Sequence, residues 1–502
     1  MAAPSVIAPA PPAPSTAATL LETAFDAAHF RALAAPLVAR LAALLDDARR
    51  PVPTLPVLPW VEPAEQLARW PLHPAGDDAT AADALPAFDA LVARALDGAT
   101  HLHDPGFVGH QVAPVLPLAA LCELAATLLN NGSAVYEMGP VSTVMERHVV
   151  RWMCDVAGLP ASAGGVLTSG GTLATLTALL AARQAKAGFD SWTLGAHDGA
   201  PLALLVSEQA HYCADRAVRI MGWGSDGVIR VPVDADHRMR PDALDAAWRD
   251  AVARGRRPIA VVGSACTTAT GSFDPLDAIA DVCAARGLWF HVDGAHGASF
   301  LLDPARRALL RGIERADSVV WDAHKMLLQP ALVTGVLFRD ERHAASAFAQ
   351  DASYLLDGDP RDTWWDLASR TFECTKKWMA LKLYATLACY GPAMLAEYVS
   401  RTADLAGRFA ALLREAPDFE LAVAPQCNIV VFRHVPARLA GDAAALDALQ
   451  PAIRRRVIEG GRFYPVQVRL GGTTWLRTTL MNPFTTDAHL AALLDELRAA
   501  AA

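Results

Sequence analysis

The chain has 502 residues, of which 53% are hydrophobic, and its 44 basic and 53 acidic residues give a formal net charge of -9. This length is enough for a large core and more than one domain. The acidic balance argues against a nucleic-acid-binding surface. Eight scattered cysteines without a C-x-x-C pair favour reduced thiols in a cytoplasmic protein over a disulfide scaffold or a zinc site.

The N-terminal part of the chain has three predicted pieces. Residues 1–18 are rich in Ala and Pro and lack a basic segment, which predicts a flexible tail and no signal peptide. Residues 19–100 are expected to form a helical segment. The sequence shows no run of about 18 consecutive apolar residues, so we predict no membrane span. Within this segment, the proline-rich stretch 51–60 is expected to be an extended arm, lying either on a partner subunit or on the chain's own surface.

A loop rich in Gly, Pro and His follows at 101–117, and long polar loops in compact enzymes are commonly functional. His110 and Gln111 in this loop are candidates for substrate contacts. His101 and His103 could ligate a metal, but no matching set of ligands follows them, so we predict no metal site here.

From residue 164 to 339 short β-rich runs alternate with helical segments, which predicts an α/β fold with a mostly parallel sheet and functional loops at the carboxyl ends of its strands. The expected strands are 165–167, 202–207, 227–231, 259–264, 288–292, 318–321 and 334–338. Residues 371–415 are expected to be helical, and 418–502 to form a smaller α+β region. We therefore expect a large domain over 101–395 and a small C-terminal domain over 396–502.

The segment 168–172, Thr-Ser-Gly-Gly-Thr, lies between an expected strand and an expected helix. Glycines permit close backbone approach, and a helix N-terminus offers free N–H groups and a positive dipole end, so this segment could bind a phosphate. It lacks both the P-loop and the dinucleotide-binding patterns. Ordinary N-cap chemistry is the alternative interpretation.

A single lysine, Lys325, follows the expected strand 318–321 and the polar turn 322–324, and it precedes an apolar run at 326–328. Burial disfavours its charged form, so we expect its pKa to fall and its amine to become available as a nucleophile for a carbonyl carbon. The alternative is a lysine that extends from the strand edge into water.

Two further polar side chains follow expected strands. His211 presents a flat ring that could stack on an aromatic cofactor, although a structural histidine is the alternative. Asp293 emerges from the apolar strand 288–292 and needs a partner, such as the protonated nitrogen of a pyridine ring. A rival interpretation makes His291, Asp293 and His296 the ligands of a metallohydrolase, without a downstream carboxylate cluster to complete the set.

A phosphate cradle, a stacking histidine, a strand-end aspartate and a lysine are, in this order, the parts that pyridoxal 5'-phosphate (PLP) requires. The segments that contain them resemble those of the group II PLP-dependent amino acid decarboxylases. The resemblance rests on NNGSAVYEMGP (130–140), TSGGT (168–172), SEQAHY (207–212), CTTATGSFDP (266–275), HVDGAHG (291–297) and WDAHKMLLQP (321–330).

The resemblance implies the PLP-dependent fold type I, a homodimer with a shared active site, and release of CO2 from an amino acid substrate. It implies that Lys325 would hold the cofactor as a Schiff base and that Asp293 would pair with the pyridine nitrogen. His211 would stack over the ring, with Ala295 beneath it. The remaining implied cofactor contacts are Gly171, Thr172 and His324 at the phosphate and Thr267 near the ring.

One departure from the family pattern concerns the proton donor. Several members place a tyrosine on a mobile loop, but the corresponding residues 357–369 hold Trp364 and Trp365 and no tyrosine, and the nearest is Tyr354. His211 could serve as the donor instead. Oxidative deamination to an aldehyde, which accompanies loss of that tyrosine elsewhere in the family, remains an alternative outcome.

Another departure is Lys376-Lys377, where the family usually has two arginines. Lysine lacks the bidentate fork of arginine, so this pair is less suited to bind a carboxylate.

The motifs are most similar to those of the diaminobutyrate and glutamate branch. The expected substrate is a small polar L-amino acid, with L-2,4-diaminobutyrate as the first candidate. Alternatives are an aromatic or acidic substrate, a PLP-dependent lyase or aminotransferase reaction, and a cofactor-free binding protein.

Overall fold

The computed structural model describes residues 19–73, 75–76, 79–195, 199–348 and 363–502. It divides into two compact units, Met1–His101 and Leu102–Ala502. The predicted tail over 1–18 lies outside the described residues.

The first unit is helical. Its helices are α1 (Leu20–Ala24), α2 (Ala27–Asp47), α3 (Pro63–Arg69) and α4 (Ala81–Asp97). Helices α2 and α4 pack on each other, and the Arg40 guanidinium donates to both Asp89 carboxylate oxygens at 2.9 and 2.8 Å. The arm over 51–60 is non-helical, as predicted, and Thr54 donates to the Asp47 carboxylate at the end of α2. By length and composition alone α2 could cross a membrane, a property that core helices and N-terminal signal sequences share.

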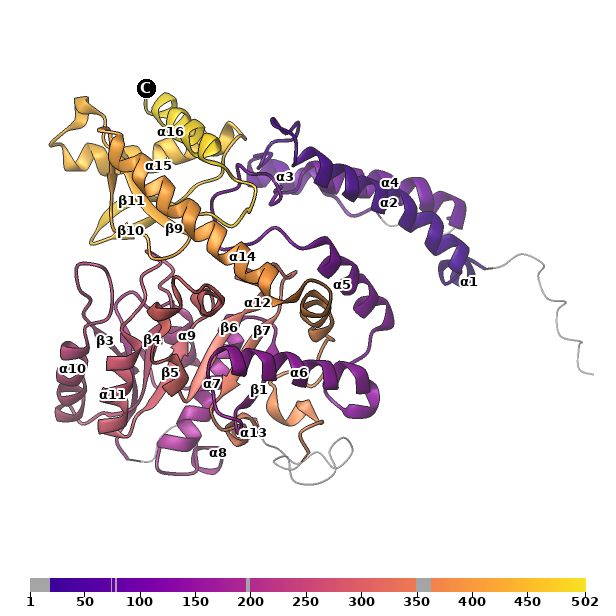
Figure 1. Ribbon diagram of the computed structural model, residues 1–502. Coiled ribbons are helices and arrows are strands. Elements are labelled where there is room, and N and C mark those ends of the chain that lie inside the picture. The colour runs from indigo at the N-terminus through magenta and orange to yellow at the C-terminus, as the bar shows by residue number, and fades with distance from the viewer. Residues whose placement is uncertain (1–18, 74, 77–78, 196–198, 349–362) are drawn as a thin grey trace, which may run out of the picture. The chain divides into compact units, whose positions relative to one another are not determined.

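The second unit contains a seven-stranded sheet (Figure 1). Its strand order is β1 (Gly164–Thr168), β7 (Thr334–Phe338), β6 (Ser318–Asp322), β5 (Trp289–Asp293), β4 (Arg257–Ser264), β2 (Leu202–Ser207) and β3 (Val228–Val231). Strand β7 runs antiparallel to both of its neighbours, and the other adjacent pairs are parallel. The predicted mostly parallel sheet is confirmed.

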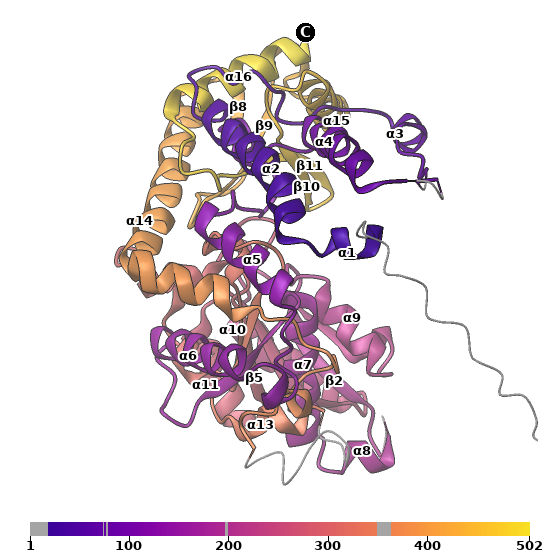
Figure 2. The same ribbon diagram turned by 90° about the vertical axis from the view of Figure 1, so that its right-hand side faces the viewer.

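Helices cover both faces of this sheet, which explains why its strands are apolar almost throughout. In β2, Leu204 and Val206 pack into one core with α7 and α9, whereas Ala203 and Leu205 face the opposite core with α6, α10 and α11. The helices are α6 (Pro140–Val156), α7 (Gly171–Lys186), α9 (Cys213–Ile220), α10 (Pro241–Ala253) and α11 (Leu276–Arg286). Figure 2 shows α7 and α6 on the sheet from a second direction.

A smaller sheet follows in the C-terminal part, as predicted. Its order is β10 (Val466–Leu470), β11 (Thr473–Thr479), β9 (Ile429–His434) and β8 (Phe419–Leu421), with helices α15 (Ala443–Glu459) and α16 (Asp487–Ala501) packed on it. The long helix α14 (Ala380–Glu415) breaks at Gly391, which has a φ of 73° and is followed by Pro392. The prediction of helix from residue 371 is wrong, since helix begins only at Ala380, after a non-helical segment over 371–379.

The remaining elements are short connections, apart from α5 (Pro117–Leu129). They are α8 (Ser191–Leu194), α12 (Ala323–Met326), α13 (Arg342–Ser346) and the 3-10 turns Tyr136–Met138, Ser225–Gly227, Gly297–Leu302, Arg307–Leu310, Ile313–Arg315, Leu367–Arg370 and Ala437–Leu439. Since β1, β2, β4, β5 and β6 run in one direction, their carboxyl ends lie at one edge of the sheet, where the predicted site residues follow them.

Candidate active site

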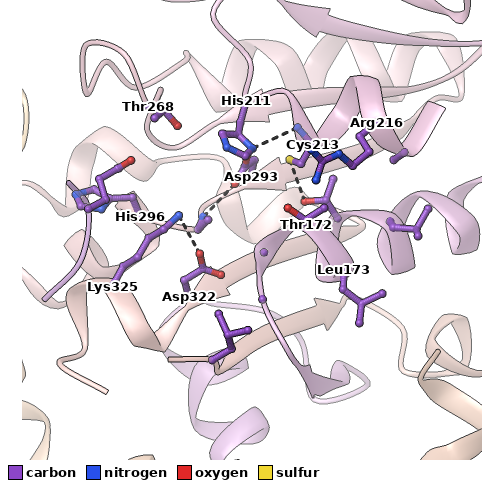
Figure 3. A pocket seen from close by; sticks show the side chains of 18 of the residues that line it. Thr172, Leu173, His211, Cys213, Arg216, Thr268, Asp293, His296, Asp322 and Lys325 are labelled. Carbon is purple, nitrogen blue, oxygen red and sulfur yellow. Dashed lines mark hydrogen bonds and ion pairs between the residues drawn. The ribbon is translucent and has the colours of Figure 1, made fainter. Parts of the chain in front are cut away.

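A cavity of about 450 Å³ opens at this edge. Its lining includes residues that follow five strands, among them Gly171 after β1, His211 after β2, Cys266 after β4, Asp293 at the end of β5 and Lys325 after β6. Figure 3 shows His211, Asp293, Asp322 and Lys325 converging on the same space. The parallel sheet therefore gathers the predicted residues although they are far apart in the chain.

The segment after β1 forms an open N-terminus on α7 at the cavity wall. Gly170 has a φ of 131°, a conformation that side-chain-bearing residues rarely adopt. A Cβ on Gly171 would lie 3.1 and 3.2 Å from the two Asp322 carboxylate oxygens. Within the described residues no side chain caps this 16-residue helix, so its first N–H groups are available to an anion such as a phosphate.

Lys325 forms an ion pair with Asp322, with Nζ 2.9 Å from Oδ2. The expectation that its pKa would fall is wrong. Burial does lower the pKa, but the charge of Asp322, its hydrogen bond and the charge of Asp293 together raise it above the ordinary value. Asp322 also accepts a hydrogen bond from Thr334 Oγ1 at 2.5 Å, so it is fixed in place beneath the amine.

Asp293 and His211 face the same cavity as Lys325. The Asp293 carboxylate accepts a hydrogen bond from the Ala295 backbone N–H at 3.2 Å. Burial lowers the pKa of His211, which keeps the ring neutral. His211 Nδ1 accepts from the Cys213 backbone N–H at 3.3 Å, so the neutral ring carries its proton on Nε2.

The other predicted contacts divide into two groups. Gln111, Thr172, Ala295 and His324 line the cavity. Thr267 does not line it: the Thr267 hydroxyl is buried in a hydrogen bond with Thr270 at 2.8 Å, and the next residue, Thr268, reaches the cavity.

His110 also lies outside the cavity lining and pairs through Nε2 with the Tyr464 hydroxyl at 3.1 Å. Neither lysine of the 376–377 pair is free for a substrate carboxylate, because Lys376 pairs with Glu146 and Lys377 with Glu123. His110 therefore does not contact the cavity in the way predicted for a substrate-binding residue. Lys376 and Lys377 likewise do not reach the cavity to bind a substrate carboxylate.

The rival metal set is not assembled. His291 is buried in the core with Nδ1 2.8 Å from Ser318 Oγ, and among the described residues it belongs to no group of potential metal ligands. His101 uses both ring nitrogens on backbone carbonyls, at 2.8 and 3.0 Å. Of the loop over 357–369, only 363–369 is described, and Tyr354 lies outside the described residues.

Two residues of this region were not singled out in the sequence. Asp322, which controls the charge of Lys325, could have been found from its place at a strand end, three residues before the lysine. Arg477 on β11 is 5% exposed, and its Nε and Nη2 have no hydrogen-bond partner within the described chain. Its charge acts on Cys266 and His296, both of which line the cavity. An arginine inside the strand sequence TTWLRTT was its only signal.

The geometry fits PLP. The open N-terminus of α7, with a glycine where a Cβ would crowd Asp322, suits a phosphate. Lys325 offers an amine after β6, and Asp293 offers a carboxylate for a ring nitrogen from the end of the neighbouring parallel strand β5. The donor set contains the three kinds of group that the cofactor needs.

Comparison with known proteins gives the same picture. Residues 86–435 match the family model described as the pyridoxal-dependent decarboxylase conserved domain. The chain is 33% identical over 407 residues to L-2,4-diaminobutyrate decarboxylase of Rhizobium meliloti, covering 80% of this chain and 79% of that protein. It is 28% identical over 403 residues to aromatic-L-amino-acid decarboxylase of Bacillus atrophaeus, covering 80% and 82%.

Solved structures agree in fold. The crystal structure of mouse CSAD superimposes with a TM-score of 0.86 at 28% identity, covering 94% of this chain and 98% of that one. The structure of Oryza sativa TDC with PLP and tryptamine gives a TM-score of 0.83 at 25% identity, covering 95% and 98%.

Proposed function

Because the chain belongs to the pyridoxal-dependent decarboxylase family and is a PLP-dependent carboxy-lyase of fold type I, we propose that it converts a small polar L-amino acid to its amine and CO2. The first candidate is L-2,4-diaminobutyrate. The observation that carries the proposal is the cavity in which Lys325, Asp293 and His211 meet the open end of α7.

The chain's residues would hold the cofactor at three points. Lys325 would bind the aldehyde carbon, the N-terminus of α7 with Thr172 would bind the phosphate, and Asp293 would keep the ring nitrogen protonated. When bound, the protonated ring accepts the electron pair that remains after the carboxyl group leaves. The ion pair with Asp322 at 2.9 Å would hold Lys325 in its protonated form and orient the amine, and the proton that Lys325 must lose would leave to solvent, since, despite burial, the pKa of the Asp322 carboxyl is itself lowered by the lysine charge.

His211 is the proposed proton donor to the substrate carbon. Its neutral ring carries a proton on Nε2 and lines the cavity beside Asp293. To donate, the ring would take up a proton on Nδ1 and release the proton of Nε2 to the carbon, and the nearby Asp293 charge favours the protonated ring against the effect of burial; in its neutral form the ring can stack on an aromatic cofactor.

Arg477 is the proposed ligand of the substrate's carboxylate. A buried guanidinium with two unpartnered nitrogens is costly, and a bidentate carboxylate is the partner that its geometry favours. Its charge already acts on two residues of the cavity wall, Cys266 and His296. Arg477 does not itself line the cavity, so the carboxylate would reach it through the wall that Cys266 and His296 form.

A cationic substrate side chain is supported by Glu373. Ser169 lines the cavity, and its hydroxyl donates a hydrogen bond to Glu373 Oε1 at 2.7 Å. The Glu373 carboxylate is therefore in contact with a residue of the cavity wall. Among the relatives, the diaminobutyrate decarboxylase of Rhizobium meliloti has the higher identity of the two compared above. Both observations favour a diamino acid over an aromatic one.

The test is CO2 release by the purified holoenzyme across a panel of L-amino acids, with identification of the amine. We expect the highest kcat/KM for 2,4-diaminobutyrate or another small polar amino acid. Release from aromatic amino acids alone would overturn the substrate assignment. Formation of an aldehyde together with ammonia and hydrogen peroxide would show that the reaction is oxidative deamination and not simple decarboxylation.

A homodimer is also proposed, in the cytoplasm. The described part of the first unit leaves large apolar side chains exposed, including Leu21 at 70%, Phe25 at 86% and Leu67 at 79%. Apolar surface of this kind commonly marks an association site. Sedimentation of the holoenzyme should give twice the chain mass of 53.3 kDa, and a stable monomer with full activity would exclude the shared active site.

A further inference from the structure

Three potential metal ligands meet at one wall of the cavity: Cys266 after β4, His296 after β5 and Cys427 before β9. Their donor atoms all lie within 4.8 Å of one another. The three residues are 8%, 2% and 1% exposed, so water does not surround them. Cys266 and His296 line the cavity, and Cys427 lies behind them.

The two sulfurs are spaced as zinc ligands. Cys266 Sγ and Cys427 Sγ are 3.8 Å apart. With Zn–S bonds of about 2.3 Å and a tetrahedral angle, two thiolates on one zinc ion lie about 3.8 Å apart. A disulfide needs about 2.05 Å, so a covalent bridge would require a larger rearrangement than a metal ion.

The histidine presents a free lone pair. Asn428 Nδ2 donates to the Leu480 carbonyl at 3.2 Å, which directs Asn428 Oδ1 to His296 Nε2 at 2.7 Å. Nε2 therefore carries the proton and Nδ1 the lone pair. Within the described chain, Nδ1 is buried without a hydrogen-bond partner. A second nitrogen fixed by an amide oxygen is the usual support of a metal-binding histidine.

The surrounding charge suits a zinc ion held by two thiolates. Such a complex is neutral, whereas the nearby cations of Lys325 and Arg477 would oppose a bare dication. Cysteine binds zinc as the thiolate, so each of the two thiols must lose its proton when the ion binds. On binding, two S–H bonds break, two Zn–S bonds form, and two protons go to solvent.

We propose that Cys266, Cys427 and His296 bind one zinc ion, through two thiolates and Nδ1, with the fourth coordination position facing the active-site cavity. Soft thiolates with one imidazole select zinc over magnesium or calcium. An open fourth position on three protein ligands would hold water or an anionic group of a ligand. The ion would occupy substrate space, so zinc would inhibit the enzyme; only this inhibition rests on the proposed function.

Binding is tested on reduced, tag-free holoenzyme stripped with a chelator and titrated with Cd2+ and Zn2+. We expect one ion per chain after gel filtration, an ultraviolet thiolate-to-cadmium charge-transfer band, and release of two protons per ion. The variants are Cys427→Ser and Cys427→Val, with Cys283→Ser as the matched control because Cys283 is a buried thiol on α11 outside the group.

Both Cys427 variants should weaken Cd2+ binding at least tenfold, and His296→Gln should weaken it while leaving part of the charge-transfer band. The Cys283→Ser variant should bind as the unmodified chain does. Equal binding by all variants would overturn the proposal, as would no stoichiometric binding by the unmodified chain. A fall of two in the thiol count of oxidised, metal-free protein would identify a disulfide instead. Using two substitutions at 427, checked by circular dichroism, separates loss of a ligand from loss of folding.

Inhibition is measured separately with whichever amino acid the panel identifies. Zinc should lower kcat/KM of the unmodified chain and of Cys283→Ser, and a chelator should restore it. Stoichiometric binding without inhibition would overturn only the placement of the open position in the cavity. The binding measurements stand even if no amino acid in the panel is decarboxylated.

Discussion

The charge of Lys325 depends on the neighbouring carboxylate of Asp322, which has no proposed contact with the substrate. Asp322 is 2% exposed and lies 2.9 Å from the amine, and its charge and hydrogen bond, together with the charge of Asp293, outweigh the effect of burial on the pKa of Lys325. A lysine in an apolar segment is expected to have a lowered pKa only when no anion is buried with it. The sequence showed the lysine and the apolar run, but not the orientation of a carboxylate three residues earlier.

Replacing Asp322 by Asn should lower the pKa of Lys325, because the ion pair that raises it is removed. A lower pKa means more free amine at neutral pH, so recombination of the apoprotein with PLP should become faster there. The rising limb of the rate against pH, followed by the visible absorbance of the bound cofactor, should move to lower pH. An unchanged pH profile would show that Asp322 does not control the charge of the lysine.

Replacing Arg477 by Gln should raise KM for the amino acid by about tenfold to a hundredfold, since a hydrogen bond to a charged group contributes about 1.5–3 kcal/mol. Cofactor affinity, measured by absorbance, should stay within a factor of two. Arg477→Lys keeps the charge but not the fork, so it should recover only part of the loss. If the substitution lowered only the affinity for the cofactor and left KM unchanged, the proposed role of Arg477 in binding the substrate carboxylate would be wrong.

Several site residues were predictable because each follows a strand and carries an unusual chemical group there. Lys325, Asp293 and His211 fall in this class. The choice between Thr267 and Thr268 was not predictable, since it depends on which hydroxyl turns inward to Thr270. The cluster of Cys266, His296 and Cys427 was also hidden, because its members are separated by up to 161 residues.

At the scale of elements, the N-terminus of α7 is the part most sensitive to added volume. A Cβ at Gly171 would lie 3.1 Å from a carboxylate that Lys325 and Thr334 hold in place. Such overpacking costs about 1–3 kcal/mol.

Gly171→Ala should therefore weaken PLP binding by about tenfold or more, measured by titrating apoprotein with the cofactor. Gly407→Ala is the matched control, because a Cβ there meets nothing within 4 Å on α14. Equal affinity of the two variants would mean that the cofactor phosphate does not bind at this helix end.

A buried ion pair joins α6 to the segment before α14. Lys376 and Glu146 are both about 2% exposed, and Glu146 Oε1 also accepts from the Leu167 backbone N–H in β1 at 2.8 Å. Burial lowers the pKa of Lys376, which shows the cost of its isolation from water.

Lys376→Met should reduce the free energy of unfolding by about 3 kcal/mol, because it leaves a buried carboxylate unpaired. Adding Glu146→Gln should recover much of the loss, since the amide oxygen can still accept from Leu167. Urea unfolding at fixed protein and cofactor concentration gives both values. A double variant no more stable than the single one would show that the pair has another role.

At the scale of the whole molecule, the order of elements was largely predictable. Alternating strands and helices over 164–339 indicate a parallel sheet, and the observed bounds of β2 and β7 coincide with the expected 202–207 and 334–338. The reversal of β7 was not predictable, because its apolar sequence TGVLF carries no sign of direction. The three-residue strand β8 was too short to give a pattern, and the expected helix is absent from 371–379, where Lys377 forms a β-bridge with Gly132 and the Lys376 carbonyl accepts from the Ser133 backbone N–H.

Sodium borohydride can make the proposed bond between Lys325 and PLP permanent in the holoenzyme. Proteolysis and mass spectrometry of the reduced protein then locate the label. We expect a reduced pyridoxyl group on the peptide that contains Lys325 and no such group in Lys325→Ala. A label on another lysine, such as Lys186 or Lys382, or no label in an active, yellow protein, would contradict this assignment.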